Sequence, residues 1–593
     1  MKAVVLTAGI ARRMQPLSDH LHKTLLPIGE STILGRIIDG LLALDVTDIT
    51  LVTGHRADDL KTFMAERYPK LAVKTVHNAR YAETNNIVSL SLALDAMTLD
   101  DDLLLIESDL LFDASVLRSL LLPGGENLAL VDRYRPGLDG TVVSASGGYI
   151  DGVFPPHLQG EGFTYDDKFK TLNIYRFNKD FVRARFQPLL SCYANLIDQN
   201  CYYELVLGML VNMQRERIRA VVVDAPWAEV DDPNDFASAR FTFEPQQRAQ
   251  LLERTAGGHW SVDLLDFHFI RNMHFPTDAM IAALRQALPG LVRSYGSSQG
   301  VLDEKLSFHL KCEPKRVLAL HGASQIYPWL PELLGPGPVL APWPTFGEYK
   351  RVFPQHARYD DLPGIDLQKL EAQVEHARTI VIVNPNNPTG TTLGTRWIHT
   401  LAKRHADKRF VVDESFIDFS AEESLVPLLE REPLPNVLVL KSLSKTLGAP
   451  GLRLGYAYSC DLELIAKIRA HIPIWNLSAP AEFFLELLLK FRPELARSLT
   501  QTASDREDLA ARLRELPQVE RVFPSGADFL LVKLRGSDPA IGAWLVQQLL
   551  ARFRIYIKDV SERFAERGVW LRFAVRLPQE HQRLIEGLKA VLA

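Results

Sequence analysis

The sequence predicts an α/β protein built from two units. Short apolar runs of strand length alternate with helix-favouring segments from residue 2 to residue 109, which is the pattern of a doubly wound sheet. A second series of such runs lies between residues 316 and 440. Between the two series, the polar stretch 244–254 is followed by two glycines, as in a linker. We expect the first unit at 1–240, the linker at 241–258, and the second unit at 259–593 with a small subdomain from about 475 to 593.

Composition and charge exclude several classes of protein. At 593 residues the chain is too long for one ordinary domain. A hydrophobic content of 47% is that of a soluble globular protein, and a formal net charge of -5 gives no footprint for nucleic acid or an anionic membrane. The four cysteines form no C-x-x-C pair, so neither a zinc site nor a disulfide framework is indicated. The chain opens on a short strand rather than a signal peptide, and no apolar run reaches ~18 residues, so we expect a cytoplasmic protein.

The first apolar run leads into a turn suited to a nucleoside triphosphate. Residues 2–6 read as a buried strand and continue into small residues that include Ala8 and Gly9. Backbone N–H groups in such a turn point toward a ligand, and basic side chains neutralise phosphate charge. Arg13 and Lys23 are the basic candidates, and we expect both to act in catalysis as well as in nucleotide binding.

Two carboxylates that follow strand-like runs, Asp109 and Asp231, are the candidate metal ligands. A pair of this kind can share one Mg²⁺, which bridges the phosphates and neutralises charge on the leaving pyrophosphate. The alternative is that each aspartate caps the N-terminus of a helix. Glu229 and Asp232 are near alternatives for the second ligand.

Residues 6–14, with Lys23 after them, resemble the signature of nucleotidyltransferases that join a nucleoside triphosphate to a sugar phosphate or phosphocholine. Thr7, Ala11 and His22 depart from that signature. Residues 78–90 are similar to an element of the phosphocholine cytidylyltransferase branch. The resemblance implies a Rossmann-like nucleotidyltransferase domain.

That branch implies CTP as the nucleotide, although the spacing of residues cannot identify the base. It places Thr84, Asn85 and Ser89 near the base and metal, and Glu204 near the acceptor. A helix N-cap at Thr84 or Asn85 and a helix-surface carboxylate at Glu204 are the open alternatives.

The second unit is organised around residues 441–456. Two hydroxyls, Ser442 and Ser444, flank Lys445, and Arg453 follows among glycines. A lysine that forms a Schiff base must be held beside an aldehyde, while hydroxyls and a guanidinium suit a dianionic phosphate. The alternative is a basic surface turn. A further strand ends at His321-Gly-Ala-Ser-Gln325 and offers a second phosphate cradle, with Ala323, Ser324 and a helix N-terminus after them.

The order of motifs in residues 257–593 resembles fold-type I pyridoxal-phosphate (PLP) enzymes. Asn-Pro-Thr-Gly near residue 387, a strand ending at Asp413, Ser-x-Ser-Lys445 and Arg453 occur in that order. The resemblance implies a large α/β domain with a small C-terminal α+β domain. It also implies that Asn387 contacts the ring oxygen of PLP, Asp413 pairs with the pyridinium nitrogen, and Phe346 stacks on the ring.

Within that class the chain resembles the histidinol-phosphate aminotransferase and threonine-phosphate decarboxylase group. Phe416 stands where the aminotransferases usually carry Tyr, which favours the decarboxylases. The resemblance assigns to substrate binding Asn272, Arg572 and Arg576. It also implies a homodimer in which Tyr295 reaches the cofactor of the neighbouring subunit; an ordinary turn aromatic is the alternative.

The two-unit arrangement is similar to the bifunctional cytidylyltransferase/decarboxylases of fosmidomycin-type phosphonate antibiotic pathways. The resemblance implies transfer of CMP from CTP to 2-amino-4-phosphonobutyrate and PLP-dependent loss of its carboxylate. A nucleotidyltransferase joined to an aminotransferase that acts on a phosphonate or polyol phosphate is the close alternative. A catalytically inactive PLP fold that serves in dimerisation is a third.

Overall fold

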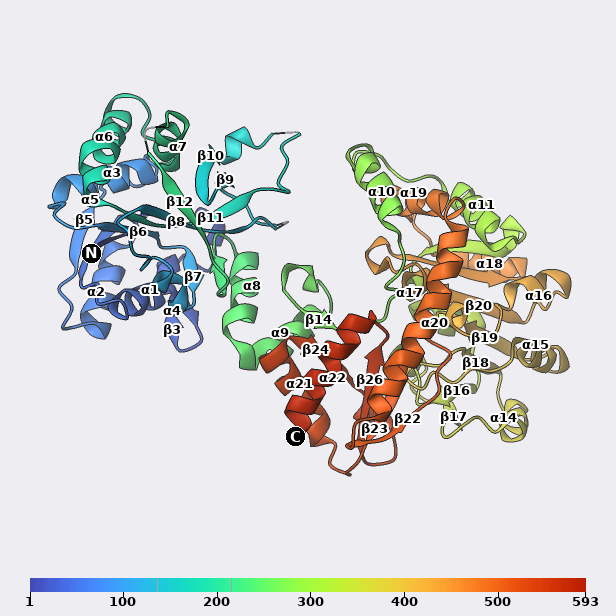
Figure 1. Ribbon diagram of the computed structural model, residues 1–593. Helices are drawn as coiled ribbons and strands as arrows, with labels where there is room; N and C mark the ends of the chain where they lie inside the picture. Colours follow the sequence, from blue (N-terminus) through green and yellow to red (C-terminus); the bar gives the residue numbers. More distant parts are fainter. Residues whose placement is uncertain (136, 161, 215) are drawn as a thin grey trace. The chain divides into compact units, whose positions relative to one another are not determined.

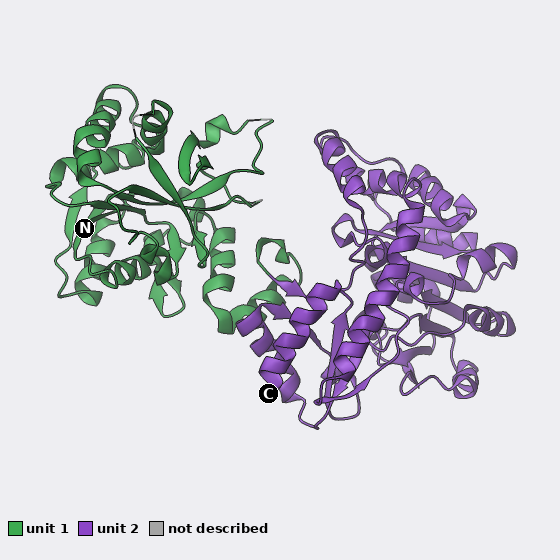
Figure 2. Ribbon diagram, viewed as in Figure 1, with its two compact units in different colours: residues 1–263 green, residues 264–593 purple. Residues whose placement is uncertain are grey.

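The computed structural model describes residues 1–135, 137–160, 162–214 and 216–593 (Figure 1). Two compact units, Met1–Asp263 and Leu264–Ala593, make up the chain (Figure 2). Both are α/β, which confirms the predicted fold class. In the part of the chain that the structure describes, no helix combines the length and the apolar character needed to cross a membrane.

Unit 1 is built on a mixed sheet with the strand order β5-β4-β1-β6-β11-β8-β12-β10-β9. Its strands are β1 (Lys2–Thr7), β4 (Asp48–Thr53), β5 (Lys74–His77), β6 (Leu103–Glu107), β8 (Asn127–Arg133), β9 (Val142–Ser146), β10 (Tyr149–Phe154), β11 (Phe169–Phe177) and β12 (Ile218–Val222). Strands β5, β4, β1 and β6 are parallel, whereas β11 runs antiparallel to β6.

Helices cover both faces of this sheet because its central strands are apolar on both sides. One face packs on α1 (Ile33–Leu42), α2 (Ala57–Arg67) and α4 (Ala114–Arg118), and the other on α3 (Asn86–Ala96), α6 (Gln187–Leu196) and α7 (Glu204–Asn212). Figure 1 shows these two layers. A short pair of strands, β7 (Leu110–Phe112) with β13 (Trp227–Glu229), precedes α8 (Pro233–Phe243).

The register of β1 against β6 positions the first site. Lys2 pairs with Leu103 and Leu6 pairs with Glu107, so both strands end at the same edge of the sheet. The segments that leave this edge therefore lie side by side, as ligand-binding segments do in doubly wound sheets. The segment 241–258 contains α9 (Arg248–Thr255) and folds with unit 1.

Unit 2 is built on a seven-stranded sheet with the order β15-β21-β20-β19-β18-β16-β17. The strands are β15 (Val317–His321), β16 (Val339–Trp343), β17 (Ala357–Asp360), β18 (Thr379–Val383), β19 (Arg409–Asp413), β20 (Val437–Ser442) and β21 (Leu454–Ser459). The described helices around it are α10 (Asp278–Leu291), α11 (Gln299–Leu310), α12 (Leu330–Leu334), α13 (Gly347–Val352), α14 (Leu367–Val374), α15 (Thr395–Arg404), α16 (Val426–Arg431), α17 (Leu443–Thr446), α18 (Leu462–Ala470) and α19 (Ala479–Leu488).

A smaller layer completes unit 2. Its sheet pairs β22 (Val519–Val522), β23 (Phe529–Leu534), β26 (Val569–Ala574) and β25 (Lys558–Asp559), with a separate pair of β14 (Leu265–Asp266) and β24 (Ile555–Tyr556). The helices α20 (Arg492–Arg514), α21 (Ala540–Phe553) and α22 (Pro578–Leu592) pack on this sheet through one apolar core (Figure 1).

One local expectation differs from the structure. The sequence predicts a helix directly after Ser324, but residues 323–325 and 327–329 form two 3-10 turns, and α12 begins only at Leu330. Pro328 and Pro331 each lack a backbone N–H, so a continuous α-helical hydrogen-bond ladder cannot form through this segment.

Two candidate active sites

Unit 1 contains a polar cavity of about 600 Å³ at the edge where β1 and β6 end. Among the residues that line it are all ten that the sequence analysis assigned to nucleotide, metal or acceptor in this unit: Ala8, Gly9, Arg13, Lys23, Thr84, Asn85, Ser89, Asp109, Glu204 and Asp231. Tertiary structure therefore brings together segments that lie up to 223 positions apart between Ala8 and Asp231.

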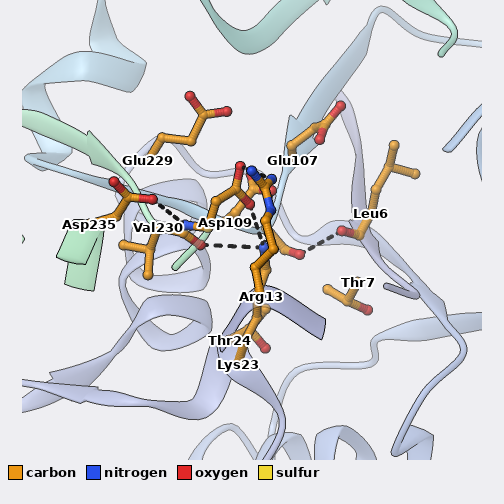
Figure 3. Close-up of polar contacts among 12 residues, drawn as sticks. Leu6, Thr7, Arg13, Lys23, Thr24, Glu107, Asp109, Glu229, Val230 and Asp235 are labelled. Atoms are coloured by element: carbon orange, nitrogen blue, oxygen red, sulfur yellow. Dashed lines mark hydrogen bonds and ion pairs between the residues drawn. The ribbon is translucent and has the colours of Figure 1, made fainter. Parts of the chain in front are cut away.

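The centre of the cavity is an ion-pair cluster around Lys23 (Figure 3). Lys23 Nζ lies 3.2 Å from Asp109 Oδ2 and 3.3 Å from Asp231 Oδ1, and Arg13 Nη2 donates to Asp231 Oδ2 at 2.8 Å. Burial alone would lower the pKa of Lys23, but the two carboxylates outweigh it and raise that pKa. Lys23 is therefore a fixed positive charge at the strand ends.

The two aspartates fit a magnesium ion. Asp109 Oδ1 is buried and has no hydrogen-bond partner among the described residues, so one ligand oxygen is free. No cluster of three or more metal-ligating side chains occurs in the described ranges. Mg²⁺ is usually held by one or two carboxylates together with water and substrate phosphates, which is what Asp109 and Asp231 offer on the two sides of Lys23.

The near alternatives for the second ligand have other partners. Asp232 caps α8 and accepts hydrogen bonds from Asn234 N and Asp235 N, which is the capping role considered for the aspartates. Glu229 Oε2 lies 3.1 Å from Lys170 Nζ. Asp231 is thus the acid at this end that faces Lys23.

The residues expected near the base also support local structure. Asn85 caps α3, and its Oδ1 accepts from Asn86 N at 2.8 Å. Thr84 Oγ1 and Ser89 Oγ each accept from Asn78 Nδ2 at 3.1 Å. Asn85 therefore both caps α3 and lines the cavity, so the capping role does not exclude a contact with the nucleotide.

His22, which replaces the usual proline, joins the loop of Lys23 to the end of β1. Its Nε2 donates to Thr7 O at 3.1 Å, while its Nδ1 accepts from Thr24 N at 3.2 Å. Burial lowers the pKa of His22 to about 4, with further lowering from the Lys23 charge. The neutral ring can accept at one nitrogen and donate at the other, so His22 ties the loop that carries Lys23 to the end of β1.

Glu107, which the sequence analysis missed, lines this cavity beside the predicted Glu204. Glu204 is buried and Glu107 is half-buried, and Asn86 Nδ2 donates to Glu107 Oε1 at 3.0 Å and to Glu204 Oε2 at 3.5 Å. Burial raises the pKa of Glu204 to about 7 and the pKa of Glu107 well above its usual range, in each case with other acids nearby. The position of Glu107, two residues before Asp109 at a strand end, was the available signal. Glu107 and Glu204 form an acidic wall of the cavity that the turn after β1 also lines. Figure 3 shows Glu107 near Asp109.

Unit 2 contains a cavity of about 390 Å³ between the large sheet and the small layer. Nine predicted residues line it: Ala323, Ser324, Phe346, Asn387, Asp413, Ser442, Lys445, Arg453 and Arg572. Phe416, the position that departs from the aminotransferases, also lines it and packs edge-on against Phe529 at 5.2 Å.

One end of this cavity is a cradle for a phosphate. Arg453 Nη2 donates to Ser324 Oγ at 3.1 Å and Nη1 to Ser444 Oγ at 3.5 Å. A Cβ at Gly322 would lie 2.5 Å from Arg453 Nη2, and one at Gly455 would lie 2.6 Å from Ala323 N. Glycine thus lets the backbone N–H groups and the guanidinium approach one point, as a phosphate requires.

Lys445 and Asp413 occupy the middle of the cavity. Burial lowers the pKa of Lys445, and the Arg453 and Arg572 charges lower it further, against the opposing effects of Asp528 and Asp413. Asp413 Oδ2 accepts from the hydroxyls of Tyr327 at 2.9 Å and Tyr349 at 2.8 Å. The residues fit PLP: an amine whose neutral form is accessible, and an oriented carboxylate for a pyridinium nitrogen.

Arg572 faces Asn387 across this cavity. Its Nη1 donates to Asn387 Oδ1 at 3.0 Å and its Nη2 to His268 O at 2.5 Å. Its Nε is buried without a hydrogen-bond partner in the described structure. Burial lowers the pKa of Arg572 to about 9, with a further contribution from Arg563. The two Nη atoms of Arg572 are therefore fixed by hydrogen bonds, whereas its Nε–H is free to donate to a ligand.

Four predicted residues do not line the cavity. Asn272 is buried and donates to Thr446 O at 3.0 Å and to Ser498 Oγ at 2.8 Å. Arg576 donates to Asp266 O at 2.9 Å and pairs with Glu580 at 2.8 Å. Ser444 Oγ accepts a hydrogen bond from Arg453 Nη1 at 3.5 Å but does not line the cavity. Tyr295 is 78% exposed and stacks on Trp475 at a centroid distance of 4.6 Å. Asn272 and Arg576 hold together the segments around the cavity, and their contact with substrate stays a prediction.

Fold and site chemistry together define a class: a nucleotidyltransferase unit followed by a PLP-dependent unit of the aminotransferase fold. Residues 3–137 match the MobA-like NTP transferase domain model, and residues 271–588 match the aminotransferase class I and II model. The chain belongs to the aminotransferase class I and II family, with the nucleotidyltransferase unit fused in front. The predicted fusion and the prediction of an enzyme are confirmed.

Similar proteins extend this assignment. CMP-5'-(3-aminopropyl)phosphonate synthase of Streptomyces rubellomurinus (strain ATCC 31215) is 33% identical over 611 residues, covering 100% of this chain and 95% of that protein. L-serine phosphate decarboxylase of Sulfurospirillum multivorans is 30% identical over 315 residues, covering 50% of this chain and 79% of that protein. The crystal structure of L-threonine-O-3-phosphate decarboxylase from Porphyromonas gingivalis has a TM-score of 0.50 and 23% identity, covers 56% of this chain and 99% of that one, and shows the shared fold.

Proposed function

We propose that unit 1 transfers CMP from CTP to a phosphonate or phosphate oxygen, and that unit 2 removes the carboxylate from the amino acid end of the same molecule. The observation that carries the proposal is similarity across both units to one synthase of CMP-5'-(3-aminopropyl)phosphonate. The proposed acceptor is 2-amino-4-phosphonobutyrate.

In unit 1, the acceptor oxygen attacks the α-phosphorus of CTP, and the bond to pyrophosphate breaks. Arg13 and Lys23 balance the negative charge that grows on the phosphates. Asp109 and Asp231 would hold Mg²⁺ against the same phosphates, which supplies further neutralisation. Lys23 Nζ lies 3.2 Å from Asp109 Oδ2 and 3.3 Å from Asp231 Oδ1, so its charge would stand beside the bound ion.

In unit 2, the bond between Cα and the carboxylate would break. Bound PLP would supply an electron sink for the electron pair released at Cα. Arg572, with a free Nε and two anchored nitrogens, is the group that would bind and orient the carboxylate. Lys445 would return a proton to Cα after CO2 leaves, because it is the amine of the cavity beside Asp413.

The close alternative is an aminotransferase in unit 2, since the matching family model covers aminotransferases. The protein should be incubated with CTP, Mg²⁺ and 2-amino-4-phosphonobutyrate while pyrophosphate, CO2 and 2-oxo acids are followed. Pyrophosphate together with CO2 supports the proposal. A 2-oxo acid without CO2 indicates transamination, and pyrophosphate alone indicates an inactive second unit.

The acidic wall of unit 1 predicts recognition of an ammonium group on the acceptor. Glu204→Gln is expected to raise KM for 2-amino-4-phosphonobutyrate about 10-fold, because a charge-assisted hydrogen bond is lost. KM for 4-phosphonobutyrate, which lacks the amino group, should stay unchanged. Burial raises the pKa of Glu204 to about 7, so its carboxylate is increasingly neutral below that pH. KM of the wild type for the amino acceptor should therefore rise as pH falls from about 8 to 6, and the Gln variant should lose that dependence; equal profiles for both acceptors would contradict this role.

We also propose that the chain forms a homodimer through unit 2. Ile474, Trp475 and Tyr295 are 74%, 55% and 78% exposed and lie around one stacked aromatic pair, which is a surface typical of an interface. Light scattering after gel filtration should give twice the chain mass of 66.7 kDa. Trp475→Glu should shift the mass toward one chain. A fully active monomer would refute the dimer.

A further inference from the structure

Basic side chains in the cavity of unit 2 outnumber what the cofactor and a carboxylate would use. Among the described residues that line it, lysine and arginine supply five side chains, whereas Asp413 supplies the one carboxylate. Lys445 and Arg453 serve the cofactor, and Arg572 is directed to a carboxylate. Arg563 has neither role, and Lys558 lies on β25, just before the turn that carries Arg563. A buried excess of positive charge favours a ligand with a second anionic group.

Arg563 is the side chain that most needs such a ligand. Its Nη1 is buried, and no described residue accepts a hydrogen bond from it or pairs with its guanidinium. Burial lowers the pKa of Arg563, which is the effect expected for a desolvated cation without a compensating acid. An arginine in this state offers a planar fork of donors that matches an oxyanion.

The turn that carries Arg563 is held rigidly beside Arg572. Lys558 and Arg572 are direct cross-strand partners in β25 and β26, so their side chains project from the same face. After β25 the chain makes a short 3-10 turn over residues 561–563, in which Ser561 Oγ donates to Asp559 Oδ1 at 2.6 Å and accepts from Trp570 N at 3.0 Å.

Phe564 then stacks on Trp570 at a centroid distance of 4.1 Å and fixes the end of this turn. The guanidinium of Arg563 is thereby presented to the cavity by a turn whose backbone and flanking ring are both anchored. A preorganised cation loses little freedom when it binds an anion.

We propose that Arg563, with Lys558 beside it, binds the phosphorus oxyanion at the far end of the amino acid substrate, while Arg572 binds the carboxylate. The inference rests on the proposed decarboxylase activity of unit 2 and adds its selectivity: the cavity takes amino acids that carry an anionic phosphorus group. A phosphonate and a phosphate ester share this chemistry. Arg563 is a specificity-determining residue in this account, because it acts away from the bonds at Cα.

The test compares Arg563→Gln with Arg567→Gln in the full-length holoenzyme. Arg567 is an exposed arginine of the same loop and does not line the cavity, so it is a matched control. CO2 release is measured with 2-amino-4-phosphonobutyrate, O-phospho-L-serine and the uncharged norvaline. For Arg563→Gln we expect KM for both phosphorus substrates to rise roughly 10- to 100-fold, with little change in kcat and in the kcat/KM for norvaline. Arg567→Gln should match the wild type.

An equal loss for norvaline, or an unchanged KM for both phosphorus substrates, would overturn the assignment. Arg563→Lys keeps the charge and should restore part of the affinity, which separates anion binding from damage to the fold. A second readout does not need turnover: propylphosphonate titrated into the holoenzyme should perturb the absorbance of the bound cofactor, and Arg563→Gln should require at least about 10-fold more of it. If the wild type releases no CO2 from any amino acid, the proposed reaction fails, and this titration still decides the role of Arg563.

Discussion

Lys445→Ala is expected to lower CO2 release by about 10⁴-fold or more, at the upper end of what a positioned acid-base group contributes. The loss should be this large because Lys445 is both the attachment point for the cofactor and the proton donor to Cα in the proposed reaction. Pyrophosphate release from CTP should remain within about 2-fold of the wild type, because the two cavities lie in separate compact units and share no lining residue.

The measurement uses both products in one reaction mixture, with Lys467→Ala as the control. Lys467 is exposed on α18, outside the lining of the cavity, and its removal should change neither product. Borohydride reduction and peptide mapping of the wild type should find the cofactor attached at residue 445. Attachment at another lysine would disprove the assignment of this cavity.

Asp109→Asn is expected to lower pyrophosphate release by about 10²- to 10³-fold, the range found when one electrostatic contact to a transition state is removed. The substitution removes half of the acidic pair around Lys23 and replaces the free, buried Oδ1 by a neutral amide atom. CO2 release from unit 2, assayed with an amino acid that needs no CMP, should not change.

Asp224→Asn is the matched control, because Asp224 is exposed and does not line the cavity of unit 1. Wild-type activity should rise with Mg²⁺ concentration to saturation and disappear with a chelator. In Asp109→Asn the half-saturating concentration of Mg²⁺ should increase. A variant with reduced rate but unchanged Mg²⁺ dependence would assign Asp109 to orientation of Lys23 instead of metal binding.

Much of both sites was predictable because their residues occupy the ends of apolar strands. Ala8 and Gly9 follow β1, Ser324 follows β15, and Asp413 ends β19. In an α/β sheet the carboxyl ends of parallel strands share one edge. An apolar run followed by a polar residue therefore predicts that this residue lies at that edge, close to the residues that end the other strands. Of the four residues outside the second cavity, Asn272, Tyr295 and Arg576 came instead from resemblance. Ser444 came from the same local pattern as Ser442 and Lys445.

The contacts that sequence reasoning missed join distant positions without a local pattern. Tyr327 and Tyr349 reach Asp413 from 86 and 64 positions away. Lys170, in β11 of the nine-stranded sheet, reaches Glu229 in β13, which belongs to the separate sheet of β7 and β13. Arg563 lies in a polar loop and reads as a surface residue in the sequence. Its burial depends on the pairing of β25 with β26.

By itself the amino-acid sequence determined the fold class, the two-unit organisation, and the polar residues that end the strands, because hydrophobic periodicity and glycine-rich turns are local physical signals. Only the tertiary structure decided which charges are buried, which of them are paired, and which have no partner. Desolvation and the distances between segments far apart in the chain decide these properties. They explain why Asp231 pairs with Lys23 whereas Asp232 caps a helix, and why Arg563 faces a cavity whereas Arg567 is exposed.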